Sequence, residues 1–155
     1  MTDRELARHA VAVLAYRGAK PWRNAPATFA TFDTGAGHTP LVILQHLGDL
    51  MEWALRHVEG APRWHTDALG TWDSEGARFF AALAALDARL ASDEPVACDL
   101  GRLLAGPIAD AFSHIGQLMM LRRMAGSPVY GENYFVADIV TGRVGEAQSP
   151  PVQPF

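Results

Sequence analysis

Three polar side chains in the second half of the chain have types and a spacing that suit metal binding. The stretch DAFSHIGQL, residues 110–118, places Asp110, His114 and Gln117 in a largely apolar run. On a helix, His114 lies about 40° and Gln117 about 20° from Asp110 around the axis, so the three share one stripe. An aspartate and a histidine four residues apart can offer two ligands to the same divalent metal ion.

A metal site needs a third ligand from another element, and His46 in PLVILQHLGDLMEWAL is the candidate. On a helical wheel His46 falls about 100° from Gln45, outside the charged face of its helix. With Asp110 and His114 it would form a two-histidine, one-carboxylate set. Such a set leaves coordination positions open for water or substrate, which is typical of catalytic metal sites. Four further residues are candidates for orienting a bound water or lining the pocket: Gln117, Trp53, Leu50 and Leu121.

Each of these residues also has a reading without a metal. Asp110 would lie in the first turn of a helix that begins near Pro107, where the helix dipole stabilises a carboxylate without any metal. Asp110 and His114 could form an ion pair inside the protein, and His46 could be a hydrogen-bonded core residue. The remaining histidines are expected at the surface or in loops: His9, His38, His57 and His65.

The periodicity of apolar residues predicts four helices that must position these side chains. They cover roughly residues 3–17, 40–60, 73–92 and 107–126, with Gly18 and Pro21 expected to end the first. Thr39 and Asp73 are the expected N-caps of the second and third. The fold class is therefore all-α, a four-helix bundle with long interhelical connections.

The last predicted helix is apolar nearly all round, so we expect it to be buried and its Asp110 to need a partner there. The helix over 40–60 has a polar face that includes Gln45 and Asp49. A short helix is expected within 132–140. We divide the chain into a bundle domain, residues 1–142, and an extended proline-rich tail, residues 143–155.

Composition excludes several classes of protein. The formal net charge is -4 and Lys20 is the only lysine, so a nucleic-acid-binding surface is not expected. Cys98 is the only cysteine, which excludes an internal disulfide and a cysteine-rich zinc site. The chain shows no signal peptide and no apolar run of the ~18 residues that a membrane span needs. We expect a cytoplasmic protein without a membrane or nucleic-acid partner.

The stretches PLVILQHLGDLMEWAL, DAFSHIGQLMMLRRMAGSPV and NYFVADIVTG resemble the DinB-like (DinB/YfiT) superfamily of metalloproteins from the second helix to about residue 142. That pattern has one histidine on the second helix and an H-x3-H pair on the last long helix. His46 and His114 match two of the three positions, and Asp110 stands at the first position of the pair.

The resemblance implies a four-helix bundle of DinB/YfiT-like topology, one divalent metal ion (Zn, Ni, Fe or Mn) and a homodimer. Some relatives are transferases or isomerases that use a low-molecular-weight thiol. We therefore expect a metal-dependent enzyme, a transferase or hydrolase, that acts on a small molecule. The nucleophile would be water or a thiolate bound to the metal, because Cys98 lies in a loop without an obvious base. The alternative is a non-enzymatic bundle protein that binds a metal or a small ligand.

Overall fold

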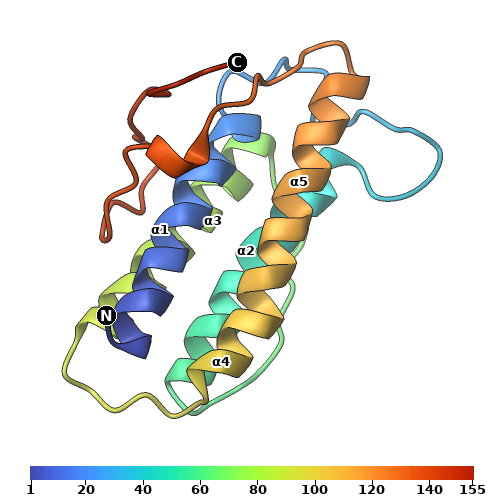
Figure 1. Ribbon diagram of the computed structural model, residues 1–155. Helices are drawn as coiled ribbons and strands as arrows, with labels where there is room; N and C mark the ends of the chain where they lie inside the picture. The colour runs from blue at the N-terminus through green and yellow to red at the C-terminus, as the bar shows by residue number, and fades with distance from the viewer.

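Four long helical segments form the body of the protein in the computed structural model, which describes residues 1–155 (Figure 1). They are α1 (Asp3–Trp22), α2 (Pro40–Val58), α3 (Trp72–Ala91) and a last segment made of three parts. That segment joins α4 (Leu100–Leu103), a π-helical stretch (Leu104–Ile108) and α5 (Ala109–Met124). A 3-10 turn follows at Tyr134–Val136, and the structure has no strand. The prediction of an all-α bundle is confirmed.

The helices are arranged so that α3 and α5 each contact both α1 and α2. The side-chain partners define their directions. Arg8 pairs with Asp87, so α1 and α3 run antiparallel, whereas α1 and α5 run parallel. Because α2 and α3 also run parallel, the connection over 59–71 must return along the length of the bundle (Figure 1). This segment lies against α2, where Thr66 donates to the carboxylate of Asp49.

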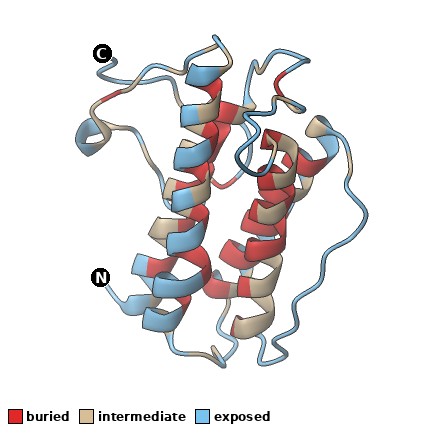
Figure 2. Ribbon diagram, turned by 90° about the vertical axis from the view of Figure 1, so that its right-hand side faces the viewer, coloured by how far each residue is buried: buried red, intermediate tan, exposed pale blue.

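One contiguous core joins all four segments. Its buried residues gather on the sides of the helices that face one another, and exposed residues cover the outside (Figure 2). The largest fully buried side chains include Phe79, Met51 and Leu118, one from each of three helices. No helix of the structure combines the length and the apolar character needed to cross a membrane.

The prediction that Gly18 and Pro21 end the first helix is wrong, since α1 continues to Trp22. Pro21 lies in the last turn, where few backbone hydrogen bonds remain to be lost. Gly18 is needed for packing rather than for a turn: a Cβ there would lie 2.8 Å from the ring of Phe79. The low helix propensity of glycine predicts that the helix ends here. The close contact with α3 explains why a glycine nevertheless lies inside it.

The last helix differs from its prediction in two ways. The chain is already helical from Leu100, and the break falls at Gly106, whose φ of -90° and ψ of -105° leave the helical region. The helix is not buried all round either, because Met120 and Met124 are 50% and 57% exposed. An outer position in the bundle leaves one apolar side of α5 in water.

Part of the predicted polar face of α2 is turned inwards. Gln45 and Asp49 are buried, and the guanidinium of Arg78 on α3 pairs with the carboxylate of Asp49 and donates to the backbone carbonyl oxygen of Gln45. The side-chain amide of Gln45 donates instead to the carbonyl oxygen of Asp67 in the 59–71 connection. Arg78 also forms ion pairs with Glu52 and Glu75. Burial opposes the charge of Arg78, but hydrogen bonds to the two glutamates and the charge of Asp49 outweigh it and raise the pKa of the guanidinium. The acidic residues Asp49 and Glu52 of α2 thus bind a neighbouring helix.

The end of the chain returns to the bundle. Residues 143–155 contain no helix. They form an isolated bridge between Pro154 and Glu132, and the Phe155 N–H donates to the carbonyl oxygen of Gly131. The helix predicted within 132–140 is the single 3-10 turn over Tyr134–Val136.

Candidate metal site

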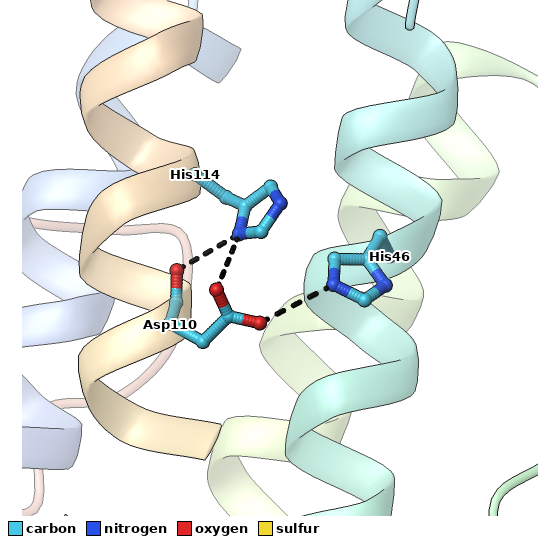
Figure 3. A group of neighbouring side chains, drawn as sticks. All are labelled: His46, Asp110 and His114. Carbon is cyan, nitrogen blue, oxygen red and sulfur yellow. Dashed lines mark hydrogen bonds and ion pairs between the residues drawn. The ribbon is translucent and has the colours of Figure 1, made fainter. Parts of the chain in front are cut away.

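Two helices bring the three predicted ligands together (Figure 3). His46 comes from α2, while Asp110 and His114 lie one turn apart on α5. Each residue offers a nitrogen or oxygen atom, and these atoms lie within 4.8 Å of one another. His46, Asp110 and His114 therefore form a group that could hold a metal ion.

The carboxylate of Asp110 lies between the two imidazoles. One oxygen is 3.2 Å from Nδ1 of His114 and the other is 3.5 Å from Nε2 of His46. The two rings also meet directly, edge to face, with centroids 4.6 Å apart at an interplanar angle of 62°. His46 and Asp110 are 64 positions apart in the sequence. They lie close together because the core packs α2 against α5.

A hydrogen bond to the backbone determines which nitrogen of His114 is free. The Nδ1–H of His114 donates to the carbonyl oxygen of Asp110 at 2.9 Å, and a carbonyl oxygen can only accept. Nδ1 therefore carries the proton in this arrangement, and the lone pair lies on Nε2, the usual form of a ligating histidine. In Figure 3 that second nitrogen points away from α5, into the space before α2.

The expectation that Asp110 is buried is wrong. Its side chain is 47% exposed, while those of His46 and His114 are 33% and 20% exposed. Asp110 belongs to the first turns after the π-helical stretch, on the outer side of the bundle. The carboxylate can therefore remain ionised in contact with water, and no partner is required by burial alone. The alternative interpretation, an ion pair between Asp110 and His114 inside the protein, depended on this burial and is not supported.

Aromatic rings continue the site along α2. The ring centroid of Trp64, on the connection over 59–71, lies 5.5 Å from that of His46 and 5.7 Å from that of Trp53. Trp53 in turn meets His57 edge to face at 4.6 Å. The connection thus packs one tryptophan against the site, a contact that the sequence could not predict because residues 59–71 lack any periodic pattern.

The other predicted residues are placed differently around the site. Trp53 lines a cavity that is described below. Gln117 is exposed on α5 and makes no side-chain hydrogen bond, so it is free to meet a bound molecule. Leu50 is 3% exposed and belongs to the core, and Leu121 is half-buried against that core. The sequence analysis did not assign Trp64 to the site. A large aromatic residue in an irregular segment, with a proline and a histidine nearby, was the available signal.

Comparison with models of protein families, with curated proteins and with solved structures found no match for this chain.

Proposed function

We propose that the chain is a metal-dependent enzyme of the DinB-like superfamily that holds one divalent ion with His46, Asp110 and His114. The convergence of these three donors within 4.8 Å, from two helices, carries the proposal. The resemblance of the sequence to that superfamily and the long return between the parallel helices α2 and α3 support it. The chain would act on a small molecule and not on nucleic acid, in keeping with its net charge of -4.

The donor set fits a catalytic ion better than a structural one. Two imidazoles and one carboxylate are suitable ligands for Zn, Ni, Fe or Mn, and the absence of a thiolate removes the preference for soft ions. A structural zinc site is normally closed by four protein ligands, and this group offers three. A divalent ion here would lower the pKa of a water or thiol that binds it.

The chain's own side chains have distinct parts in this proposal. His114 is held in its ligating tautomer by the carbonyl oxygen of Asp110. The half-exposed carboxylate of Asp110 leaves an approach from solvent. Burial, together with the charge of Asp99, raises the pKa of the Cys98 thiol, which opposes its use as the nucleophile. A transferase or isomerase that uses a low-molecular-weight thiol is the specific form of the proposal, and a hydrolase is the form that uses water.

The alternative is a bundle protein that binds a metal or a small ligand without turnover. One observation favours it: apart from contacts among themselves, the side chains of His46, Asp110 and His114 make no hydrogen bond to any other side chain. Second partners of that kind usually orient metal ligands and assist proton transfer in enzymes. The homodimer remains part of the proposal, supported by the exposed apolar side chains of Met120 and Met124 on α5.

Metal analysis tests the site directly. Elemental analysis of the untagged protein, after incubation with Zn, Ni, Mn and anaerobic Fe(II), should give about one divalent ion per chain. His46→Ala, Asp110→Ala and His114→Ala should each lose it, because two remaining ligands bind an ion weakly. A chelator should lower the melting temperature of the native protein and of no ligand variant, since only a bound ion stabilises by mass action.

His57→Ala is the matched control, because His57 lies on the same face of α2 three turns further along and is not one of the donors. It should retain the ion. Absence of metal from the native protein under all four conditions would contradict the proposal. With metal established, turnover of an electrophile with bacillithiol, mycothiol or glutathione separates the thiol-dependent enzyme from the binding protein, which would bind the small molecule without converting it.

A further inference from the structure

A cavity of about 450 Å³ lies beside the donor group, where α2 meets the start of the last helical segment. Trp53 and His57 line it from α2, and Leu103, Gly106 and Pro107 line it from the other side. Cys98, Asp99 and Arg102 complete the wall. Its volume lies in the range of small-molecule sites, about 300–1,000 Å³.

The cavity and the donor group occupy one continuous stretch of the same helix interface. His46, Trp53 and His57 are separated by seven and four residues, so they share one face of α2. Pro107 precedes Asp110 by three residues, which is less than one helical turn, or about 4.5 Å along the axis. Trp64 packs against both His46 and Trp53 and so spans the boundary between the two. None of the three donors lines the cavity itself, so only a molecule that extends past Pro107 would bring one end towards Asp110.

The π-helical stretch shapes the wall nearest the donor group. Gly106 leaves helical geometry and Pro107 has no N–H to donate, so the regular hydrogen-bond ladder is interrupted there. A Cβ at Gly106 would meet nothing within 4 Å, so the space directly beside this residue is open. Interruptions of this type are frequent at functional sites because they displace side chains and backbone from the regular helix.

One cation of the cavity wall has no partner. The guanidinium of Arg102 takes part in no hydrogen bond and no ion pair, although the backbone N–H of the same residue is capped by Asp99. The Asp99 oxygen that accepts from this N–H is occupied as the N-cap of α4. His57 likewise makes no side-chain hydrogen bond and only meets the ring of Trp53. The polar end of the cavity thus offers the donors of Arg102 and His57 beside the second carboxylate oxygen of Asp99, while Trp53, Leu103 and Pro107 offer apolar surface.

We propose that this cavity binds the substrate, a small carboxylate with an aromatic or aliphatic body. The carboxylate pairs with Arg102, the body lies against Trp53 and Pro107, and the far end reaches His46, Asp110 and His114. A planar guanidinium matches a carboxylate with two parallel hydrogen bonds. Arg102 precedes Asp110 by eight residues, with the interruption at Gly106 and Pro107 between them, so the molecule must be long enough to extend past that stretch. The inference rests on the proposed function only in naming the ligand a substrate.

Binding of 4-phenylbutyrate to chelator-treated, metal-free protein tests the cavity without the ion. Titration followed by ¹H–¹⁵N NMR should shift the indole N–H signal of Trp53, identified by its loss in Trp53→Phe. The neutral 4-phenylbutanamide should bind more weakly. Arg102→Gln should weaken 4-phenylbutyrate binding by about tenfold or more, the usual effect of a hydrogen bond to a charged group. Arg102→Lys, which retains the charge but loses the fork, should fall between.

Arg123→Gln is the control, because Arg123 is an exposed arginine of α5 outside this cavity and should leave the affinity unchanged. Equal affinity for the amide, or no effect of Arg102→Gln, would overturn the proposal. The experiment is independent of the metal analysis. If the protein takes up no ion but binds the carboxylate through Arg102, the cavity proposal stands and the metal-dependent enzyme is rejected. If it takes up a metal but does not bind the carboxylate, the cavity proposal is rejected and the metal site stands.

Discussion

At the scale of single residues, the three candidate donors could be selected from the sequence, and their exposure could not. Helical periodicity brings Asp110 and His114, four residues apart, to one stripe, and it places His46 outside the charged face of another helix. The exposure of Asp110 depends on which side of α5 faces outwards. Leu118 is 1% exposed and Met120 is 50% exposed, yet both are apolar side chains. A helix with apolar residues all round carries no pattern from which its outer side can be read.

Arg78 shows a second limit of the same kind. Its partners Asp49 and Glu75 are 3% and 5% exposed, and they lie on two different helices. Gly48 allows the close approach, since a Cβ there would lie 2.7 Å from the guanidinium carbon of Arg78. A helical wheel of α2 alone shows a charged face, from which one would predict that this face is exposed to solvent. Only the packing of α3 shows that this face is shared with a neighbouring cation.

Replacing Arg78 with methionine should lower the free energy of unfolding by about 3 kcal/mol, because Asp49 and Glu75 would remain buried without a countercharge. Urea denaturation at neutral pH measures the loss. Arg123→Met removes an exposed arginine without such partners and should change stability by about 0.5 kcal/mol or less. A loss at Arg78 no larger than that at Arg123 would show that the two carboxylates are adequately solvated without the guanidinium.

At the scale of elements, helix positions were predicted well and their ends less well. The start of α2 at Pro40 and the left-handed glycines after α2 and α5, Gly60 and Gly126, agree with the expected boundaries. The N-cap of α3 is Thr71 rather than Asp73, because Thr71 accepts from the Ser74 N–H in a reciprocal capping box. Neighbouring polar residues before a helix compete for the same role, and local sequence does not rank them.

The two threonine caps provide a matched comparison. Thr71 makes a side-chain cap hydrogen bond, whereas Thr39, at the start of α2, makes none. Thr71→Ala should therefore lower the free energy of unfolding by about 1 kcal/mol, since a Ser74 N–H loses its acceptor. Thr39→Ala should have a clearly smaller effect. Urea denaturation of the two variants decides the point, and equal losses would mean that the cap bond of Thr71 contributes little.

At the scale of the whole molecule, the bundle was predictable and its connectivity was not. Four amphipathic segments in one domain indicate a bundle. That α2 and α3 run parallel follows from the 13 residues over 59–71 crossing the full length of the bundle, and segment length alone permits other paths. The position of Trp64 against His46 depends on that path. The residues that surround the three candidate donors, such as Trp64, could therefore be identified only from the structure.

The segment after α5 is attached to α1 at Glu132, and this attachment gives stability a dependence on pH. Glu132 is 2% exposed, forms an ion pair with Lys20 and accepts a hydrogen bond of 2.9 Å from the hydroxyl of Tyr16. Burial, followed by the hydrogen bond and charge of Glu132, raises the pKa of Tyr16 from 10.0 to about 12. The same contact holds the strand-like pairing of Glu132 with Pro154 near the chain end.

A raised pKa in the folded state makes this attachment sensitive to alkali. Between pH 10 and 12 unfolded Tyr16 loses its proton while folded Tyr16 keeps it. The stabilisation is thus complete below pH 10 and disappears as the pH rises through 12, a difference of about 2–3 kcal/mol at 1.36 kcal/mol per pKa unit. Tyr16→Phe should be less sensitive to pH over this interval in urea denaturation. Absorbance at 295 nm should show one of the three tyrosines ionising late in the native protein and not in Tyr16→Phe. Simultaneous ionisation of all three near pH 10 would mean that Tyr16 is open to water and that the segment carrying Glu132 is not held against α1.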